Sequence, residues 1–289
     1  MQLRKSFFAT YCRTCGVNRS GGVQEKQVDI LSFGLHLFLL CVALVIWKFT
    51  FFPASLLPAS RARAVLSLSF MFVCVSALYF ALVKWAAPSV REDSGEISFY
   101  LVFSMIWIAL VQASFSFLGI SVRDDVAERG NNSAAFVAAG LTIGATCCIA
   151  GANVGDGPGF EVVLFCGALA TTCLLLLWVL VAQISGVADV ITIDRDLATG
   201  IRAGGLLAGT GIVLGVCVAG DWVSLAATLK DFARFSWPVT IAACLFAMME
   251  RAARRRASAA APSRTVSILV ALAMVVAGAA YAQWVGRHS

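Results

Sequence analysis

Eight long runs of apolar residues constrain this chain more than any other feature of its sequence. A helix needs roughly twenty apolar residues to cross a bilayer, whereas barrel strands would show about ten residues of alternating hydrophobicity, a pattern that is missing here. The runs therefore predict an all-α, polytopic helical membrane protein with about eight transmembrane helices. The expected spans are residues 30–52, 64–86, 97–120, 134–153, 160–184, 201–219, 235–249 and 266–285.

Composition excludes a soluble domain. Of the 289 residues, 60% are hydrophobic and only 13% are charged, whereas soluble domains carry about 25% charged residues. A chain of this length could not hide so much apolar surface in a core. The seventh span is the weakest prediction, because it is short and has Pro238 near its start.

The orientation follows from the lysines and arginines of the short loops, which stay on the cytoplasmic side. The odd-numbered loops hold eleven such residues and the even-numbered loops hold three. We expect the odd loops to face the cytoplasm of a bacterial-type inner (plasma) membrane, or the matrix side of a mitochondrial inner membrane. The eleven are Arg61, Arg63, Arg123, Arg129, Arg195, Arg202, Arg251, Arg254, Arg255, Arg256 and Arg264.

The N-terminal tail, residues 1–28, opposes this orientation because it is basic and has no acidic residue before Glu25. An organelle transit segment has such a composition; a miscounted span or a misassigned start are the alternatives. Cys12 and Cys15 form a single Cys-x-x-Cys, with no second pair to complete a zinc site.

Two stretches of the chain correspond at an offset of 65 residues, "ERGNNSAAFVAAGLTIG" and "TIDRDLATGIRAGGLLAG". In each, a charged loop ends at a polar residue, Asn131 or Asp196, which we expect to cap the following helix. Each helix then carries a Gly-x-x-x-Gly, which lets another helix approach closely in lipid. The corresponding pairs include Gly140 with Gly205 and Gly144 with Gly209.

This correspondence predicts parallel two-helix internal repeats, since each unit crosses the membrane twice. The repeats and their connections define residues 97–227 as a repeat domain of four helices. Two flanking helices are expected in residues 29–96, and two more, with an Arg-rich loop, in 228–289. These flanking pairs are either degenerate copies or unrelated helices.

At "GNNSAAFVAAGLTIG", "GANVGDGPG" and "DLATGIRAGGLLAG" the chain resembles the bacterial membrane family called domain of unknown function 350. The resemblance covers about residues 97–220. It implies tandem two-helix repeats in which an Asn-x-Ala-Ala-type motif opens a glycine-bearing helix. The second copy departs from that motif, with Asp196 in place of Asn and Thr199 and Gly200 between the alanines. The resemblance implies a fold and no particular activity.

Residues that carry chemistry are scarce. There are only two histidines, His36 and His288, and eight of the ten cysteines lie in apolar spans, where a thiol acts as a small hydrophobe. We therefore expect no catalytic residue, no cofactor, no metal site and no nucleic-acid partner; the expected partners are the lipid bilayer and copies of this chain or other membrane proteins.

Two groups of polar residues suggest a further role. Asn131, Asp196, Arg129 and Arg195 would either serve the helix ends only or line a cytoplasmic vestibule for a small charged solute. Arg254, Arg255 and Arg256 would either fix the orientation or contact anionic lipid head groups.

Two functions remain open. The first is a non-enzymatic packing or scaffold subunit that acts through small-residue helix faces within a membrane complex. The alternative is a channel or transporter for a small charged solute or ion, with its pore between repeats or subunits. The sparse polar residues favour the first.

Overall fold

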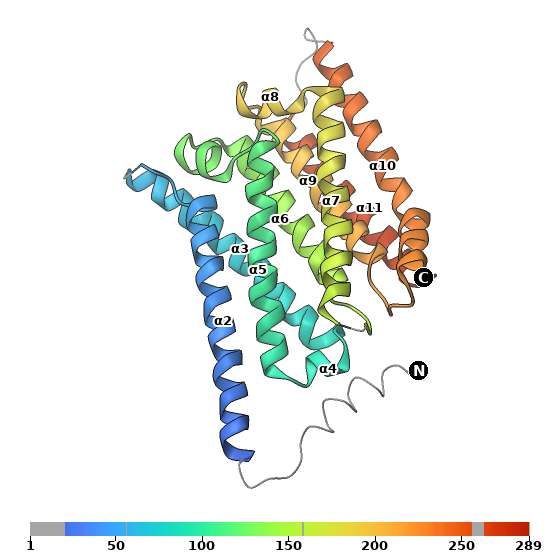
Figure 1. Ribbon diagram of the computed structural model, residues 1–289. Helices are drawn as coiled ribbons and strands as arrows, with labels where there is room; N and C mark the ends of the chain where they lie inside the picture. Colours follow the sequence, from blue (N-terminus) through green and yellow to red (C-terminus); the bar gives the residue numbers. More distant parts are fainter. Residues whose placement is uncertain (1–20, 56, 158, 256–262, 289) are drawn as a thin grey trace. The chain divides into compact units, whose positions relative to one another are not determined.

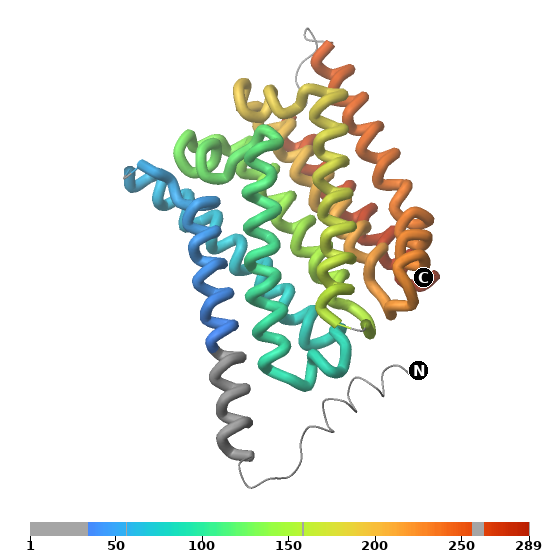
Figure 2. Tube along the Cα trace, viewed as in Figure 1, coloured from blue at the N-terminus to red at the C-terminus, as the bar shows by residue number. Residues whose placement is uncertain are grey.

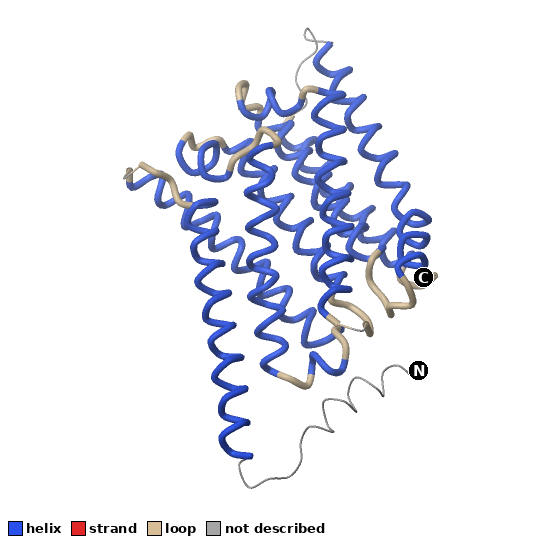
Figure 3. Tube along the Cα trace, in the orientation of Figure 1, coloured by secondary structure: helices blue, strands red, loops and turns tan. Residues whose placement is uncertain are grey.

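The computed structural model describes residues 21–55, 57–157, 159–255 and 263–288, with only the backbone for 21–33. Within these ranges the chain is helical, and its loops form a single isolated bridge, between Ala86 and Gly155, and no strand (Figure 3). Eight of the described helices are long and apolar enough to cross a membrane. The prediction of an all-α polytopic membrane protein is confirmed. The predicted transit segment, apart from its last residues, and the Cys12–Cys15 pair lie outside the described residues.

The chain divides into two compact units, Met1–Cys41 and Val42–Ser289, and the second is described here by itself. Helix α2 crosses the boundary between them. In chain order the helices are α2 (Gly21–Phe51), α3 (Pro58–Trp85), α4 (Pro88–Arg91), α5 (Ser94–Phe117), the π-helix η1 (Val122–Glu128), α6 (Asn132–Ala152), α7 (Phe160–Ser185), α8 (Val187–Thr192), α9 (Leu197–Cys217), α10 (Leu225–Arg255) and α11 (Arg264–Val285) (Figure 1).

The long helices after α2 form two layers. In the inner layer α3 packs against α6, α6 against α9, and α9 against α11. In the outer layer α5 contacts both α3 and α6, α7 contacts both α6 and α9, and α10 contacts α7 and α9. Following the colours of Figure 2 from green to red shows each outer helix leading into an inner one. Helix α9 is the centre of this arrangement, because 89% of the residues in its most apolar stretch are buried inside the protein.

The helix bounds recur with the 65-residue spacing of the sequence. Helix α9 begins 65 residues after α6, and both are 21 residues long. Helix α10 begins 65 residues after α7. The backbone repeats as well: Gly130 (φ 64°) and Arg195 (φ 55°) both adopt the left-handed conformation at the residue before the cap. We call α5–η1–α6 the first hairpin, α7–α8–α9 the second and α10–α11 the third.

Several helices begin before the expected spans: α2 at Gly21 rather than residue 30, α3 at Pro58 rather than 64, α9 at Leu197 rather than 201 and α10 at Leu225 rather than 235. The seventh span is not a short helix: α10 runs unbroken through Pro238 for 31 residues. Its first ten residues are polar enough to read as a loop, and a transmembrane helix tolerates a proline whose freed carbonyl finds another partner. The third and fifth loops are partly helical, because η1 and α8 lie in them.

Candidate functional site: a polar seam joining the hairpins

Helices α6 and α9 are in direct backbone contact. A Cβ added at Gly140 would overlap the backbone of Gly204, and one at Gly144 would lie 2.7 Å from the carbonyl oxygen of Leu207. Further along, a Cβ at Gly151 would overlap Gly215. Real Cβ atoms do not approach backbone this closely, so only glycine fits. The two helices therefore run parallel at the same depth, as two corresponding hairpins require.

The matching glycines of the second hairpin contact a different helix. A Cβ at Gly205 would lie 2.5 Å from the Cα of Ala271, and one at Gly209 would lie 2.6 Å from the carbonyl oxygen of Met274, both in α11. Gly278 of α11 faces Gly209 in return. Helix α9 thus presents small residues on two sides, one for α6 and one for α11.

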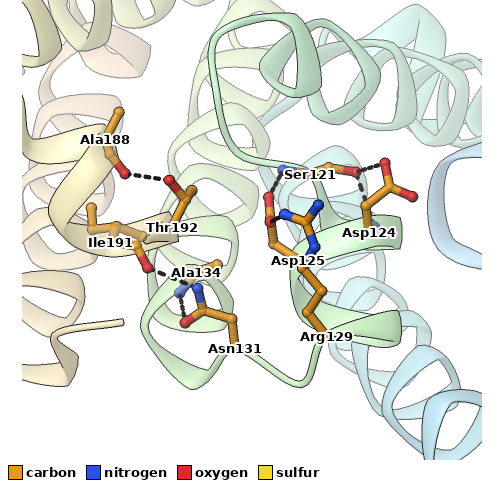
Figure 4. A network of polar contacts seen from close by, with 9 residues as sticks. All are labelled: Ser121, Asp124, Asp125, Arg129, Asn131, Ala134, Ala188, Ile191 and Thr192. Carbon is orange, nitrogen blue, oxygen red and sulfur yellow. Dashed lines mark hydrogen bonds and ion pairs between the residues drawn. The ribbon is translucent and has the colours of Figure 1, made fainter. Parts of the chain in front are cut away.

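The polar caps at the N-terminal ends of these helices join the hairpins. Asn131 is buried, and its Oδ1 accepts hydrogen bonds from the backbone N–H groups of Ser133 and Ala134. Its Nδ2 donates to the carbonyl oxygen of Ile191 in α8, at 2.7 Å (Figure 4). The Ser133 hydroxyl donates to the Asp196 carbonyl, also at 2.7 Å. The start of α6 is therefore fixed to the loop of the second hairpin.

Asp196 caps α9 as Asn131 caps α6, but its side chain is a carboxylate rather than a neutral amide. Its carboxylate accepts hydrogen bonds from the backbone N–H groups of Ala198 and Thr199. Burial alone would raise the pKa of this carboxyl, but the hydrogen bonds from Thr199 and Ala198 and the positive charge of Arg202 outweigh it, and the pKa is lowered. The group is thereby held as a carboxylate.

A buried ion pair connects three helices one turn further on. The Arg202 guanidinium of α9 donates from Nε and Nη2 to the two carboxylate oxygens of Glu250 in α10, at 2.7 and 2.9 Å. Its remaining donors reach the hydroxyls of Ser267 in α11 and Thr199 in α9. Both charged side chains are about nine-tenths buried. This is the bidentate geometry in which an arginine–carboxylate pair is strongest.

Sequence reasoning missed this pair. Arg202 counts there among the charges of the fifth loop, although the expected span begins at residue 201, and Glu250 counts as the first residue of the Arg-rich loop; both lie inside helices. One signal was available, since a charge at the first turn of an apolar span is costly unless it has a partner. The choice of partner depends on how α9 and α10 pack, because the two residues are 48 positions apart in the sequence.

The first and third hairpins are fixed at the same end of the bundle. Arg63 of α3 donates to the carbonyl oxygens of Ala127 and Glu128, and Arg254 of α10 donates to the carbonyl oxygen of Gly186 at 2.9 Å. The described residues of the odd-numbered loops therefore lie at one end of the bundle. We call these contacts the polar seam: Arg63 with the end of η1, Asn131 with Ile191, Ser133 with Asp196, Arg202 with Glu250, and Arg254 with Gly186.

The other predicted residues lie at the surface of the seam. Arg129 is exposed and pairs with the buried Asp125 at 2.9 Å (Figure 4), and Arg195 and Arg255 are exposed. Arg254 is exposed as well, although its guanidinium donates to the carbonyl oxygen of Gly186, the residue between α7 and α8. Arg256 lies outside the described residues. The seam brings Asn131 and Asp196 into adjoining loops, and the vestibule stays a prediction.

The contacts of the seam hold the ends of neighbouring helices together. Among the described residues no cluster of three or more histidines, cysteines or carboxylates could hold a metal ion. Fold and seam together define a polytopic membrane protein of parallel, serially packed helical hairpins. No protein-family model, curated protein or solved structure matches the chain.

Proposed function

We propose that this protein is a non-enzymatic packing or scaffold subunit of a membrane complex. The observation that carries the proposal is the backbone contact of α6 with α9 and of α9 with α11. A pore between the hairpins would need space along this row of inner helices, and glycine contact leaves none. The buried hydroxyls nearby, those of Thr142, Thr146 and Thr210, donate to carbonyls of their own helices. They are thus satisfied without water.

Helix α11 is the surface through which the subunit associates. Only 11% of the residues in the most apolar stretch of α11 are buried, although one side of the helix lies against α9. Ala273, Ala277 and Ala280 are exposed and recur at helical spacing. Small residues on a lipid-facing side allow another helix to approach closely, which is how helices associate in membranes. Self-association would continue the inner row, α3–α6–α9–α11, with a helix of a second copy. From the motifs quoted above, we also propose that residues 97–220 belong with the domain of unknown function 350 family.

The test is the mass of the purified protein in mild detergent by light scattering. We expect the parent to exceed the 30.6 kDa of one chain and Ala277→Trp to shift toward one chain, because a bulky ring blocks close approach. The control is Leu176→Trp on α7, where the side chain is 62% exposed and larger already. A parent that stays at one chain, or equal effects of both variants, would contradict self-association. Ion flux through proteoliposomes of the parent would favour the channel instead.

A further inference from the structure

At the opposite end of the bundle from the seam, α10 and α11 border an open hollow of about 450 Å³ that is lined by aromatic and basic residues. The lining residues are Arg234, Phe235, Trp237, Tyr281, Trp284 and His288. They come from the part of α10 where the apolar run begins and from the last turns of α11. We propose that this hollow binds the phosphate group of a membrane phospholipid.

The wall of the hollow is a fixed aromatic stack. Trp284 lies between the Tyr281 ring, 5.6 Å away centroid to centroid, and the His288 ring, 4.7 Å away, and both are stacked on it. The Tyr281 hydroxyl donates to the Phe235 carbonyl at 3.0 Å, which joins α11 to α10. The Tyr281 ring is thereby held in place before any ligand arrives, so its part in binding costs little ordering.

Arg234 supplies the charge. Its guanidinium carbon lies 5.2 Å from the centroid of the Phe235 ring, at the edge of the stack. The side chain is exposed and belongs to none of the ion pairs among the described residues. A guanidinium without a carboxylate partner, presented beside aromatic rings, suits a phosphate, which it can bind through two parallel hydrogen bonds.

The position of the hollow favours a lipid over a free ion. Tryptophan, tyrosine and arginine at the end of a span lie at the level of the lipid head groups. Trp237 and Trp284 are 57% and 48% exposed, so both rings are accessible to a lipid from outside the bundle. Further along α10, toward its C-terminal end, Ile241, Leu245 and Met248 are exposed and apolar. Acyl chains attached to the bound phosphate would lie along these side chains.

Native mass spectrometry of the detergent-purified full chain, titrated with short-chain lipids, tests the proposal. The probes are phosphatidylglycerol, phosphatidylcholine and a diacylglycerol with the same chains but no phosphate. We expect both phospholipids to bind and the diacylglycerol to bind much more weakly. Inorganic phosphate should not displace the phospholipid; full displacement would mean a site for free phosphate and would overturn the lipid assignment.

The variants are Arg234→Gln and, as the matched control, Arg287→Gln, an exposed arginine at the same end that does not line the hollow. Loss of one charge-assisted hydrogen-bonding group should weaken phospholipid binding about tenfold in Arg234→Gln, with Arg287→Gln close to the parent. Thermal unfolding should be the same for both, since neither arginine makes an ion pair in the described structure. Equal binding by both variants, or diacylglycerol binding as tight as phospholipid binding, would overturn the proposal.

Discussion

At the scale of single residues, the packing of this protein depends on glycines whose missing side chains are replaced by a neighbouring backbone. Gly140 and Gly144 meet α9, and Gly205 and Gly209 meet α11. In lipid there is no hydrophobic force to press helices together, so close van der Waals contact has to supply the association. A side chain at these positions would separate the helices along much of their length.

Gly140→Leu and Gly205→Leu should therefore destabilise the protein strongly. Overpacking typically costs about 1–3 kcal/mol and sometimes more, and here the obstacle is backbone that cannot rotate away. The measurement is thermal unfolding in detergent. Gly34→Leu is the control, because a Cβ there meets nothing within 4 Å, and it should leave the midpoint almost unchanged. Equal midpoints for all three variants would contradict this packing.

The two caps should respond differently to the exchange of Asn and Asp. In Asn131→Asp a carboxylate oxygen would replace the donor that binds the Ile191 carbonyl, so two acceptors would face each other in a buried site. We expect a loss of about 1–3 kcal/mol. Asp196→Asn keeps an acceptor for Ala198 and Thr199 and should cost less than about 1 kcal/mol at neutral pH. Similar losses for both would mean that capping alone matters.

Asp196 should also make stability depend on pH. Because its pKa is lowered in the folded protein, its contribution is present above the pKa of the unfolded chain, about 4, and is lost as the pH falls through the lowered folded pKa. Unfolding midpoints measured from pH 6 downward should therefore fall less steeply for Asp196→Asn than for the parent. Parallel curves would show that the carboxylate is not held this way.

At the scale of helices, the polar seam holds neighbouring hairpins in register, and the ion pair of Arg202 with Glu250 is its most buried part. Glu250→Ala should cost about 3–5 kcal/mol because it leaves a buried guanidinium without its counter-charge. The double variant Arg202→Met with Glu250→Leu should recover much of this loss. The control is Arg123→Ala, which breaks a 4.0 Å pair with Asp124 whose side chains are 35% and 59% exposed and should cost at most about 1 kcal/mol. A double variant as unstable as Glu250→Ala would contradict this reading.

Much of the helix pattern could be predicted from sequence, because local chemistry determines it. Asn131 and Asp196 cap α6 and α9 as predicted, since a cap needs only a short acceptor before an apolar run, although the apolar spans were expected to begin two and four residues later than these helices do. The start of α10 could not be predicted, because its first turns lack an apolar run. The partner of Arg202 could not be predicted either, since it depends on which helices become neighbours.

At the scale of the whole molecule, the inner helices α3, α6, α9 and α11 form a row in which each helix contacts the next. In this row the first and second hairpins meet along the backbone contact of α6 and α9, with α7 covering the outer side. Cys148 lies in that contact: its side chain is fully buried, and its Sγ lies 3.7 Å from the carbonyl oxygen of Gly211. A water path between the hairpins would have to pass close to this thiol.

The most direct test is the labelling of Cys148 by a water-soluble thiol reagent in membrane vesicles open to both sides, read by peptide mass spectrometry. We predict no labelling of Cys148 in the native membrane and complete labelling after denaturation. A cysteine introduced as Asn132→Cys, at an exposed position at the start of the same helix, should react readily under both conditions. Labelling of Cys148 in the native membrane at a rate near that of the introduced cysteine would show water between the hairpins and would contradict the closed, packing role proposed for this protein.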